Sequence, residues 1–207
     1  GIDNPFGKQL PRVLNVFSSK SSRVVRAMLQ EPMRGWQLNE LASHSDVGVS
    51  PGLMSRIKRS LVEGGYALMV DGLLRLKRPA DLLGDWVEHY RTHKPREYGF
   101  YMRGEPEQIE HQVAKWCAGA GGEYAFSRFS AAWRLAPEVR YSVASFIVTT
   151  SAILAKSLVD LSTQCGARRV DSGANLILQI SDDESYFSNR TGESLQSTSP
   201  LQTYLDL

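Results

Sequence analysis

Cysteine is scarce in this sequence, and long apolar runs are missing. The two cysteines among 207 residues, Cys117 and Cys165, are far apart, so neither a disulfide framework nor a zinc-binding spacing is visible. The longest apolar runs are far shorter than a membrane span. The opening residues, GIDNPFGKQLPRVLNVF, lack the basic and then apolar pattern of a signal peptide. These absences predict a cytoplasmic protein with no membrane partner.

Catalytic motifs are missing as well. The sequence contains no P-loop, no G-x-S-x-G and no H-E-x-x-H. The run SDDES supplies Asp182, Asp183 and Glu184 after an apolar segment, where acids can bind magnesium, but an acidic loop between strands is the simpler interpretation. The glycine-rich residues 119–123 follow a predicted helix and precede a predicted strand, the reverse of a phosphate-binding order. We therefore predict no enzyme activity, no catalytic residue, no cofactor and no metal.

Charge is distributed unevenly along the chain. Hydrophobic and charged contents of 42% and 22% are ordinary for a globular protein, and the net charge is +2. Residues 20–78 hold ten Lys or Arg against five Asp or Glu, whereas residues 79–207 hold twelve against sixteen. A basic front half and a mildly acidic back half indicate two domains with different partners.

The basic front half has the pattern of three short helices. In KSSRVVRAMLQEP, residues 24, 25, 28 and 29 form one apolar stripe, with Ser21 or Ser22 as the expected cap. WQLNELASHS predicts a second helix that turns Leu38 and Leu41 inward. The third helix is predicted in SPGLMSRIKRSLVEGG, capped by Ser50, with Leu53, Ile57 and Leu61 as its buried stripe.

A hairpin is predicted directly after these helices. YALMV and LLRLKRP are apolar segments joined by Asp71-Gly72, a strong turn signal. Three helices followed by a hairpin are typical of a winged helix-turn-helix, whose third helix lies in the major groove of DNA. The positive charge concentrates on these two elements. The predicted DNA-binding residues are Ser50, Gly52, Ser55, Arg56, Lys58, Arg59, Arg75, Lys77 and Arg78.

These residues divide by the contact expected of each. Ser55, Arg56 and Arg59 are the candidates for base edges, because arginine can hold guanine with two hydrogen bonds. Lys58, Arg75, Lys77 and Arg78 are the candidates for phosphates. A winged helix used only for protein contacts remains the alternative for the same charges.

The back half predicts alternating strands and helices. PADLLGDWVEHYRTH reads as a linking helix, on which His89 and His93 are four residues apart with no third metal ligand nearby. The expected organisation is an extension over 1–19, a winged helix-turn-helix over 20–78, a linking helix over 79–95 and a mixed α/β domain over 96–207. The predicted fold class is α+β.

Three segments carry a resemblance to a known family. The segment from SSRVVRAMLQ to DWVEHY, the segment YAFSRFSAAWRLAP and the final SPLQTYLDL together resemble the AbiEi-like transcriptional regulators, the antitoxins of type IV toxin–antitoxin systems. The resemblance covers about residues 18–207. Gln37 stands where that family usually has a capping Ser or Thr, and Ser127-Arg128 stands where it usually has Thr-Gly. Relatives commonly continue past YLDL with a glycine-arginine segment and a further helix.

The resemblance implies a bacterial repressor of its own operon, which binds double-stranded operator DNA, in some cases an inverted repeat. It also implies an antitoxin that counters a nucleotidyltransferase-like toxin without a tight complex. Monomer and dimer both remain open. Two alternatives stand beside this hypothesis: a nuclease or nucleotidyltransferase that uses the winged helix for targeting, and a module for protein interactions only.

Overall fold

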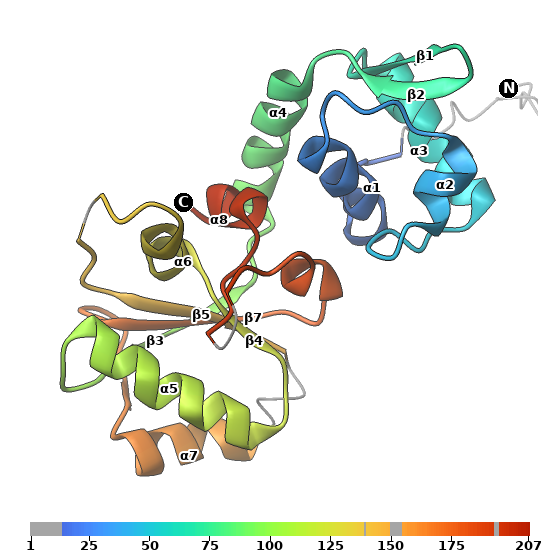
Figure 1. The fold of residues 1–207 in the computed structure, drawn as a ribbon. Helices are drawn as coiled ribbons and strands as arrows, with labels where there is room; N and C mark the ends of the chain where they lie inside the picture. Colours follow the sequence, from blue (N-terminus) through green and yellow to red (C-terminus); the bar gives the residue numbers. More distant parts are fainter. Residues whose placement is uncertain (1–13, 139, 150–154, 193–194) are drawn as a thin grey trace, which may run out of the picture. The chain divides into compact units, whose positions relative to one another are not determined.

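Helices alternate along the chain with strands that form two separate β-sheets, and the contacts between these elements divide the chain into two units (Figure 1). The computed structural model describes residues 14–138, 140–149, 155–192 and 195–207. Unit 1 ends at Trp86 and unit 2 begins at Val87, so the boundary falls inside helix α4 (Pro79–Thr92). The chain therefore has the predicted α+β class. Within the described ranges, no helix has the length and apolar character needed to cross a membrane.

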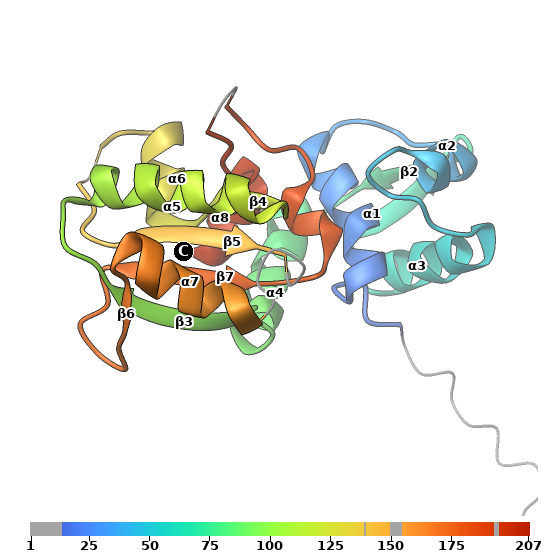
Figure 2. The same ribbon diagram turned by 90° about the horizontal axis from the view of Figure 1, so that it is seen from below.

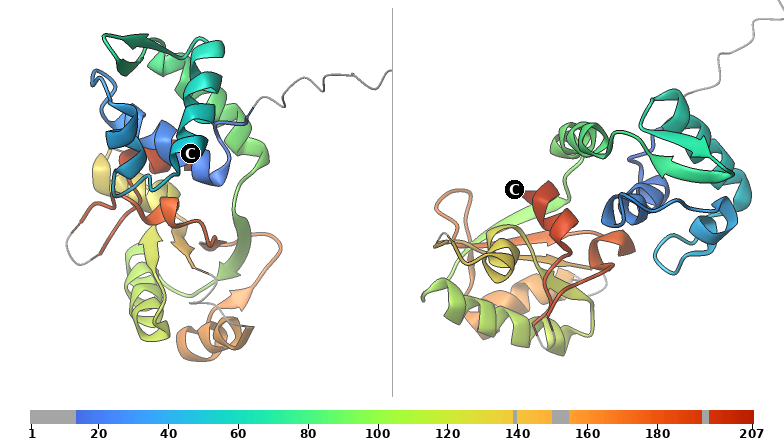
Figure 3. Two further views of the ribbon diagram at one scale, coloured as in Figure 1. Left: turned by 90° about the vertical axis from the view of Figure 1, so that its right-hand side faces the viewer. Right: turned by 45° about the horizontal axis from the view of Figure 1, so that its top comes forward.

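Unit 1 consists of three helices and a hairpin, followed by the first part of α4. The elements are α1 (Ser19–Gln30), α2 (Leu38–Ser43), α3 (Pro51–Glu63), β1 (Ala67–Val70) and β2 (Leu73–Leu76), seen from two further sides in Figure 3. Its core gathers buried apolar side chains from every one of these elements: Val24, Val25, Met28, Trp36, Leu41, Met54, Ile57, Leu61, Ala67, Leu74, Leu82 and Trp86. Tertiary burial of one face thus stabilises helices as short as α2.

The hairpin forms where the Asp-Gly pair predicted it. Asp71 and Gly72 have φ angles of 51° and 76°, the left-handed pair of values that a tight turn between twisted strands requires. Trp36 extends this small sheet on the β2 side, because its N–H donates to the Leu74 carbonyl at 2.9 Å and its carbonyl accepts from the Leu74 N–H at 2.8 Å. The segment between α1 and α2 therefore acts as a third, one-residue strand.

Two details of the helices differ from the sequence predictions. Helix α1 begins at Ser19, with Ser18 at the cap position, so Ser21 and Ser22 lie buried inside the helix and the prediction that one of them caps it was wrong. In α3 the buried positions are Met54, Ile57 and Leu61, and Leu53 is only half-buried. A spacing of three residues and then four follows the 3.6-residue turn more closely than two steps of four.

Unit 2 is built on a mixed sheet with helices on both faces. Its elements are β3 (Arg96–Tyr101), α5 (Pro106–Ala120), β4 (Tyr124–Phe126), α6 (Arg128–Leu135), β5 (Ala144–Val148), α7 (Ala155–Cys165), β6 (Arg168–Arg169), β7 (Leu176–Ile180), the 3-10 turn η2 (Glu184–Phe187) and α8 (Pro200–Asp206). The strand order is β4-β5-β7-β3-β6, with β5 and β7 parallel and the other pairs antiparallel. Helices α5 and α7 lie on one side of the sheet, and α6 and α8 on the other (Figure 1).

The larger core of unit 2 lies between the sheet and the α5–α7 layer. Phe100, Phe126 and Phe146 project from the strands onto Val113 and Cys117 of α5. The opposite face carries the smaller cluster of Ala125, Ile147 and Phe187, and it is richer in buried polar residues. This difference leaves the α6–α8 side dependent on hydrogen bonds.

A buried polar network holds α8 in unit 2. The Tyr90 hydroxyl donates to Asp206 Oδ1 at 2.5 Å, and the Gln202 side-chain amide donates to the same oxygen at 2.9 Å and to the Tyr90 oxygen at 3.1 Å. Burial and the Asp206 carboxylate raise the pKa of Tyr90. In the terminal YLDL, Leu205 and Asp206 are buried, whereas Tyr204 is exposed.

Candidate nucleic-acid interface

Helix α3 presents one apolar face to the core of unit 1 and one charged face to solvent. The Ser50 side chain accepts a hydrogen bond from the Leu53 N–H at 3.3 Å, and Pro51 follows at the first helical position. Ser50 therefore caps the N-terminus of α3, as the sequence predicted. Gly64 and Gly65 follow its end, and Gly65 has a φ of 72°. The predicted site residue Ser50 is thus a helix cap as well as an exposed residue.

The solvent face of α3 carries all three residues predicted to contact base edges, Ser55, Arg56 and Arg59. Gly52, Ser55, Arg56 and Arg59 are all exposed, and Lys58 is half-buried at the margin of the face. Within the part of the chain that the structure describes, Arg56, Lys58 and Arg59 form no ion pair. Their charges are not neutralised within unit 1, so this helix face is cationic.

Gly52 has no role in the packing of unit 1. A Cβ atom added at this position would meet nothing within 4 Å among the described residues, and the residue lies in the first turn of a helix, where alanine is more favourable than glycine. A glycine that the fold does not need leaves backbone accessible to a close partner. This is the geometry expected where a helix N-terminus approaches a phosphate or a base.

The hairpin supplies one free cation and one that is held internally. Lys77, directly after β2, is exposed and forms no ion pair with the described residues. Arg75 is half-buried, and its Nη1 donates to the Met33 carbonyl at 3.3 Å. Its guanidinium lies 2.8 Å from the position of a Cβ on Gly35, so the glycine makes room for it. Arg75 therefore fixes the α1–α2 loop against the hairpin.

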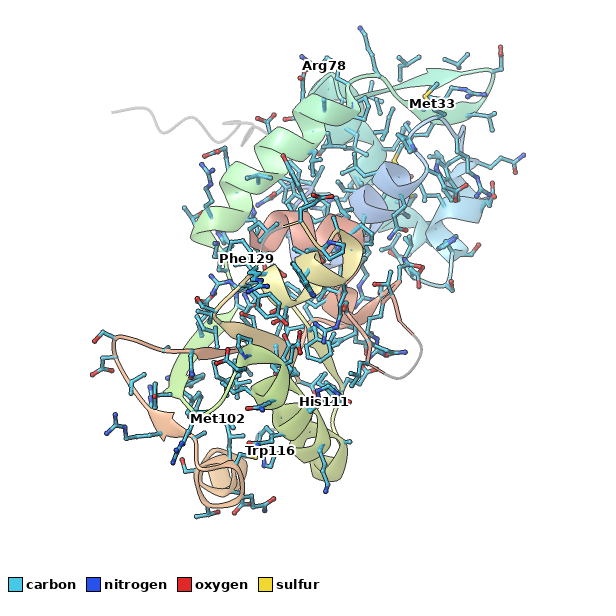
Figure 4. The ribbon with its side chains drawn as sticks, turned by 60° about the vertical axis from the view of Figure 1, so that its left-hand side comes forward. Met33, Arg78, Met102, His111, Trp116 and Phe129 are labelled. Carbon is cyan, nitrogen blue, oxygen red and sulfur yellow. The ribbon has the colours of Figure 1, made fainter. Side chains whose placement is uncertain are left out.

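Arg78 lies where the hairpin leads into α4, and it contacts the end of α3 (Figure 4). Its Nε donates to the Gly65 carbonyl at 3.0 Å and its Nη2 donates to the Gly64 carbonyl at 3.1 Å. Its Nη1 lies 3.1 Å from Asp81, and its guanidinium stacks on the Tyr66 ring at 5.8 Å. A cation at the C-terminus of a helix satisfies carbonyls that have no partner within the helix. Arg78 thus joins three elements of unit 1.

The four predicted phosphate-contacting residues therefore separate into two groups. Lys58 and Lys77 have charges that no acid of the described chain neutralises, whereas Arg75 and Arg78 are engaged inside unit 1. The sequence did not predict that Arg75 and Arg78 form contacts within unit 1. The signal available for Arg78 was the Gly64-Gly65 helix end, which needs donors, but the sequence does not say which cation supplies them.

The other candidate residues lie in ordinary structural surroundings. The rings of His89 and His93 stack at 4.0 Å, and burial followed by the charge of His93 lowers the pKa of His89. Cys117 is buried, and burial raises the pKa of its thiol to about 12. Gly121 ends α5 with a φ of 74°, so the glycine-rich run holds the last turn of α5 and its connection to β4.

The acidic run begins a short turn. Asp183 Oδ1 accepts from the Ser185 N–H at 3.0 Å, and this starts the short 3-10 turn η2, which the sequence did not predict. No group of three or more His, Cys, Asp or Glu that could hold a metal ion occurs among the residues the structure describes. Asp182 and Glu184 are exposed.

Comparisons with known proteins add no further assignment. No family model, no curated protein and no solved structure matches this chain.

Proposed function

We propose that this protein is a DNA-binding transcriptional regulator and that unit 1 is a winged helix-turn-helix. The observation that carries the proposal is the exposed cationic face of α3, next to a hairpin that presents Lys77. Three helices, a hairpin and the Trp36 bridge to β2 occur in the order that this motif requires. In this proposal α3 enters the major groove and the hairpin follows the phosphates.

Each free residue has a defined role in this proposal. Arg56 and Arg59, in the second and third turns of α3, reach the base edges, where a guanidinium pairs with guanine. Gly52 allows the helix N-terminus to approach the DNA backbone. Lys58 and Lys77 neutralise phosphates, whereas Arg75 and Arg78 hold the helix and the hairpin in place.

The resemblance to the AbiEi-like antitoxins supports a more specific proposal, an antitoxin-like repressor of its own operon. Two features of unit 2 agree with that resemblance. Arg128 has a φ of 50°, a left-handed conformation that favours glycine, at the position where the family usually has glycine. Asp206, within the terminal YLDL, is buried in the network with Tyr90. A neighbouring gene for a nucleotidyltransferase-like toxin is the observation that would test this part.

The DNA-binding proposal is tested with Arg59→Ala and Lys77→Ala in gel shifts on operator and scrambled duplexes. Arg59→Ala is expected to weaken operator binding by about 1–3 kcal/mol and to leave scrambled DNA nearly unaffected. Lys77→Ala is expected to weaken both duplexes equally and to lower the salt slope by about 0.9. Equal behaviour of the two variants on both duplexes contradicts this division of roles.

A further inference from the structure

The acidic unit 2 has one basic edge. Residues 87–207 contain twelve Lys or Arg and fourteen Asp or Glu, for a net charge of −2. Five of the twelve cations nevertheless belong to strands β3 and β6 or lie within two residues of β3: Lys94, Arg96, Arg103, Arg168 and Arg169. These two strands pair at one edge of the sheet (Figure 2). The positive charge of the unit is thus concentrated at this edge, which we call the β3–β6 edge.

A tyrosine orders two of these arginines. The guanidinium carbons of Arg96 and Arg169 lie 5.0 Å and 4.8 Å from the centre of the Tyr98 ring, so the two carbons are no more than about 10 Å apart. Arg168 is the partner of Tyr101 across the strands, and Tyr101 is 47% exposed. Stacking fixes planar guanidinium groups before any ligand arrives, which lowers the entropy lost on binding.

The acids near this edge do not neutralise it. Glu97 forms its ion pair with Arg128 at 3.2 Å and accepts from the Gln179 side chain at 3.2 Å. Glu105 caps the N-terminus of α5. In the described residues, none of the five cations forms an ion pair, and Asp171 is the remaining acid close to β6 in the chain. The edge therefore has an uncompensated positive charge.

Protection of an edge strand from unwanted pairing is the simplest alternative purpose for such charges. β6 is only two residues long, and one lysine is sufficient to discourage pairing there. Two arginines stacked on one tyrosine exceed this need. Guanidinium forks match phosphate oxygens with two hydrogen bonds, and Arg beside an exposed aromatic ring is typical of surfaces that follow a nucleic-acid strand.

We propose that the β3–β6 edge of unit 2 is a second contact site for the phosphate groups of duplex DNA. This inference rests on the proposed function, because DNA held by unit 1 raises the effective concentration of phosphates around a tethered unit 2. Arg96 and Arg169 bind phosphates, and Lys94, Arg103 and Arg168 add to the local attraction. The contact carries no sequence information. It increases affinity for every duplex long enough to reach both units.

The experiment compares the full chain carrying R96Q/R169Q with the control K115Q, which removes an exposed cation of helix α5 outside this edge. Binding to a long duplex of scrambled sequence is measured by fluorescence anisotropy between 50 and 200 mM salt. R96Q/R169Q is expected to lower the log–log salt slope by about 2, so wild type loses about tenfold more affinity than the variant across this range. K115Q is expected to leave the slope unchanged.

Further variants separate the possible failures. R96K/R169K keeps both charges and is expected to retain most of the slope, which excludes misfolding as the cause of a loss. An R96Q/R169Q slope equal to that of wild type overturns the β3–β6 edge proposal, as does a loss confined to single-stranded DNA. If R59A weakens binding to the operator and to the scrambled duplex equally, the regulator proposal fails. The effect of R96Q/R169Q on binding to scrambled DNA can still be measured in that case. A chain that binds no duplex overturns both.

Discussion

Lys77 and Arg78 are adjacent cations at the end of the hairpin, and the structure assigns them different tasks. Lys77→Ala removes an exposed side chain that contacts no acid of the described chain. Arg78→Ala removes two hydrogen bonds, at 3.0 and 3.1 Å, to the Gly65 and Gly64 carbonyls and an ion pair with Asp81 at 3.1 Å. The same change in charge is therefore expected to affect stability in one variant and DNA binding in the other.

The magnitude for Arg78→Ala follows from these contacts. A hydrogen bond from a charged donor contributes about 1.5–3 kcal/mol, but water replaces part of this at an exposed site. The Arg78 side chain is 48% exposed, and exposed ion pairs contribute about 0–1 kcal/mol. We therefore expect Arg78→Ala to lower the free energy of unfolding of unit 1 by about 1–2 kcal/mol. Lys77→Ala is expected to change it by less than about 0.5 kcal/mol.

The assay is urea unfolding of the full chain followed by tryptophan fluorescence, paired with the salt dependence of duplex binding. Lys77→Ala is expected to reduce the salt slope by about 0.9 and Arg78→Ala by less. Arg78→Lys provides the control, because lysine keeps the charge but cannot form the forked contact with both carbonyls. Arg78→Lys should lose most of the stabilisation that Arg78 provides. The salt slope of its duplex binding should equal that of the wild type. An Arg78→Ala variant as stable as Lys77→Ala would refute the role of Arg78 as a connector within unit 1.

Three further predictions concern unit 2. Arg128→Gly should be more stable than Arg128→Ala by about 1 kcal/mol, because both variants lose the Glu97 contact but only glycine accepts a φ of 50° without strain. A denaturant midpoint for Arg128→Ala equal to or above that of Arg128→Gly contradicts this. Tyr90→Phe should destabilise unit 2 by about 1–3 kcal/mol, because it leaves Asp206 without its 2.5 Å donor, and an unchanged melting temperature would exclude the proposed importance of the network. Cys117, with its thiol pKa raised to about 12 by burial, should resist alkylation at neutral pH until the protein unfolds, whereas rapid labelling of the native chain at this site would show that the thiol is accessible.

Local patterns in the sequence were sufficient to predict most elements. The Asp71-Gly72 pair predicted the hairpin turn because few residues adopt two successive left-handed conformations, and the Ser50-Pro51 pair predicted the start of α3 because it both caps the helix and begins it. The alternation of helices and strands predicted for the back half also matches the order of elements in the structure. The ends of the helices were predicted less accurately, as the start of α1 at Ser19 demonstrates.

The sequence by itself determined where the positive charge is concentrated, because composition and helical spacing put Arg56 and Arg59 on one face of α3. Only the tertiary structure decided which cations remain free. Arg78 meets the Gly64 carbonyl, and Arg169 reaches the ring of Tyr98 from 71 positions later in the chain, through contacts that no local pattern encodes. Long, flexible side chains take partners according to how the backbone packs, so their roles follow from the fold and not from their neighbours in sequence.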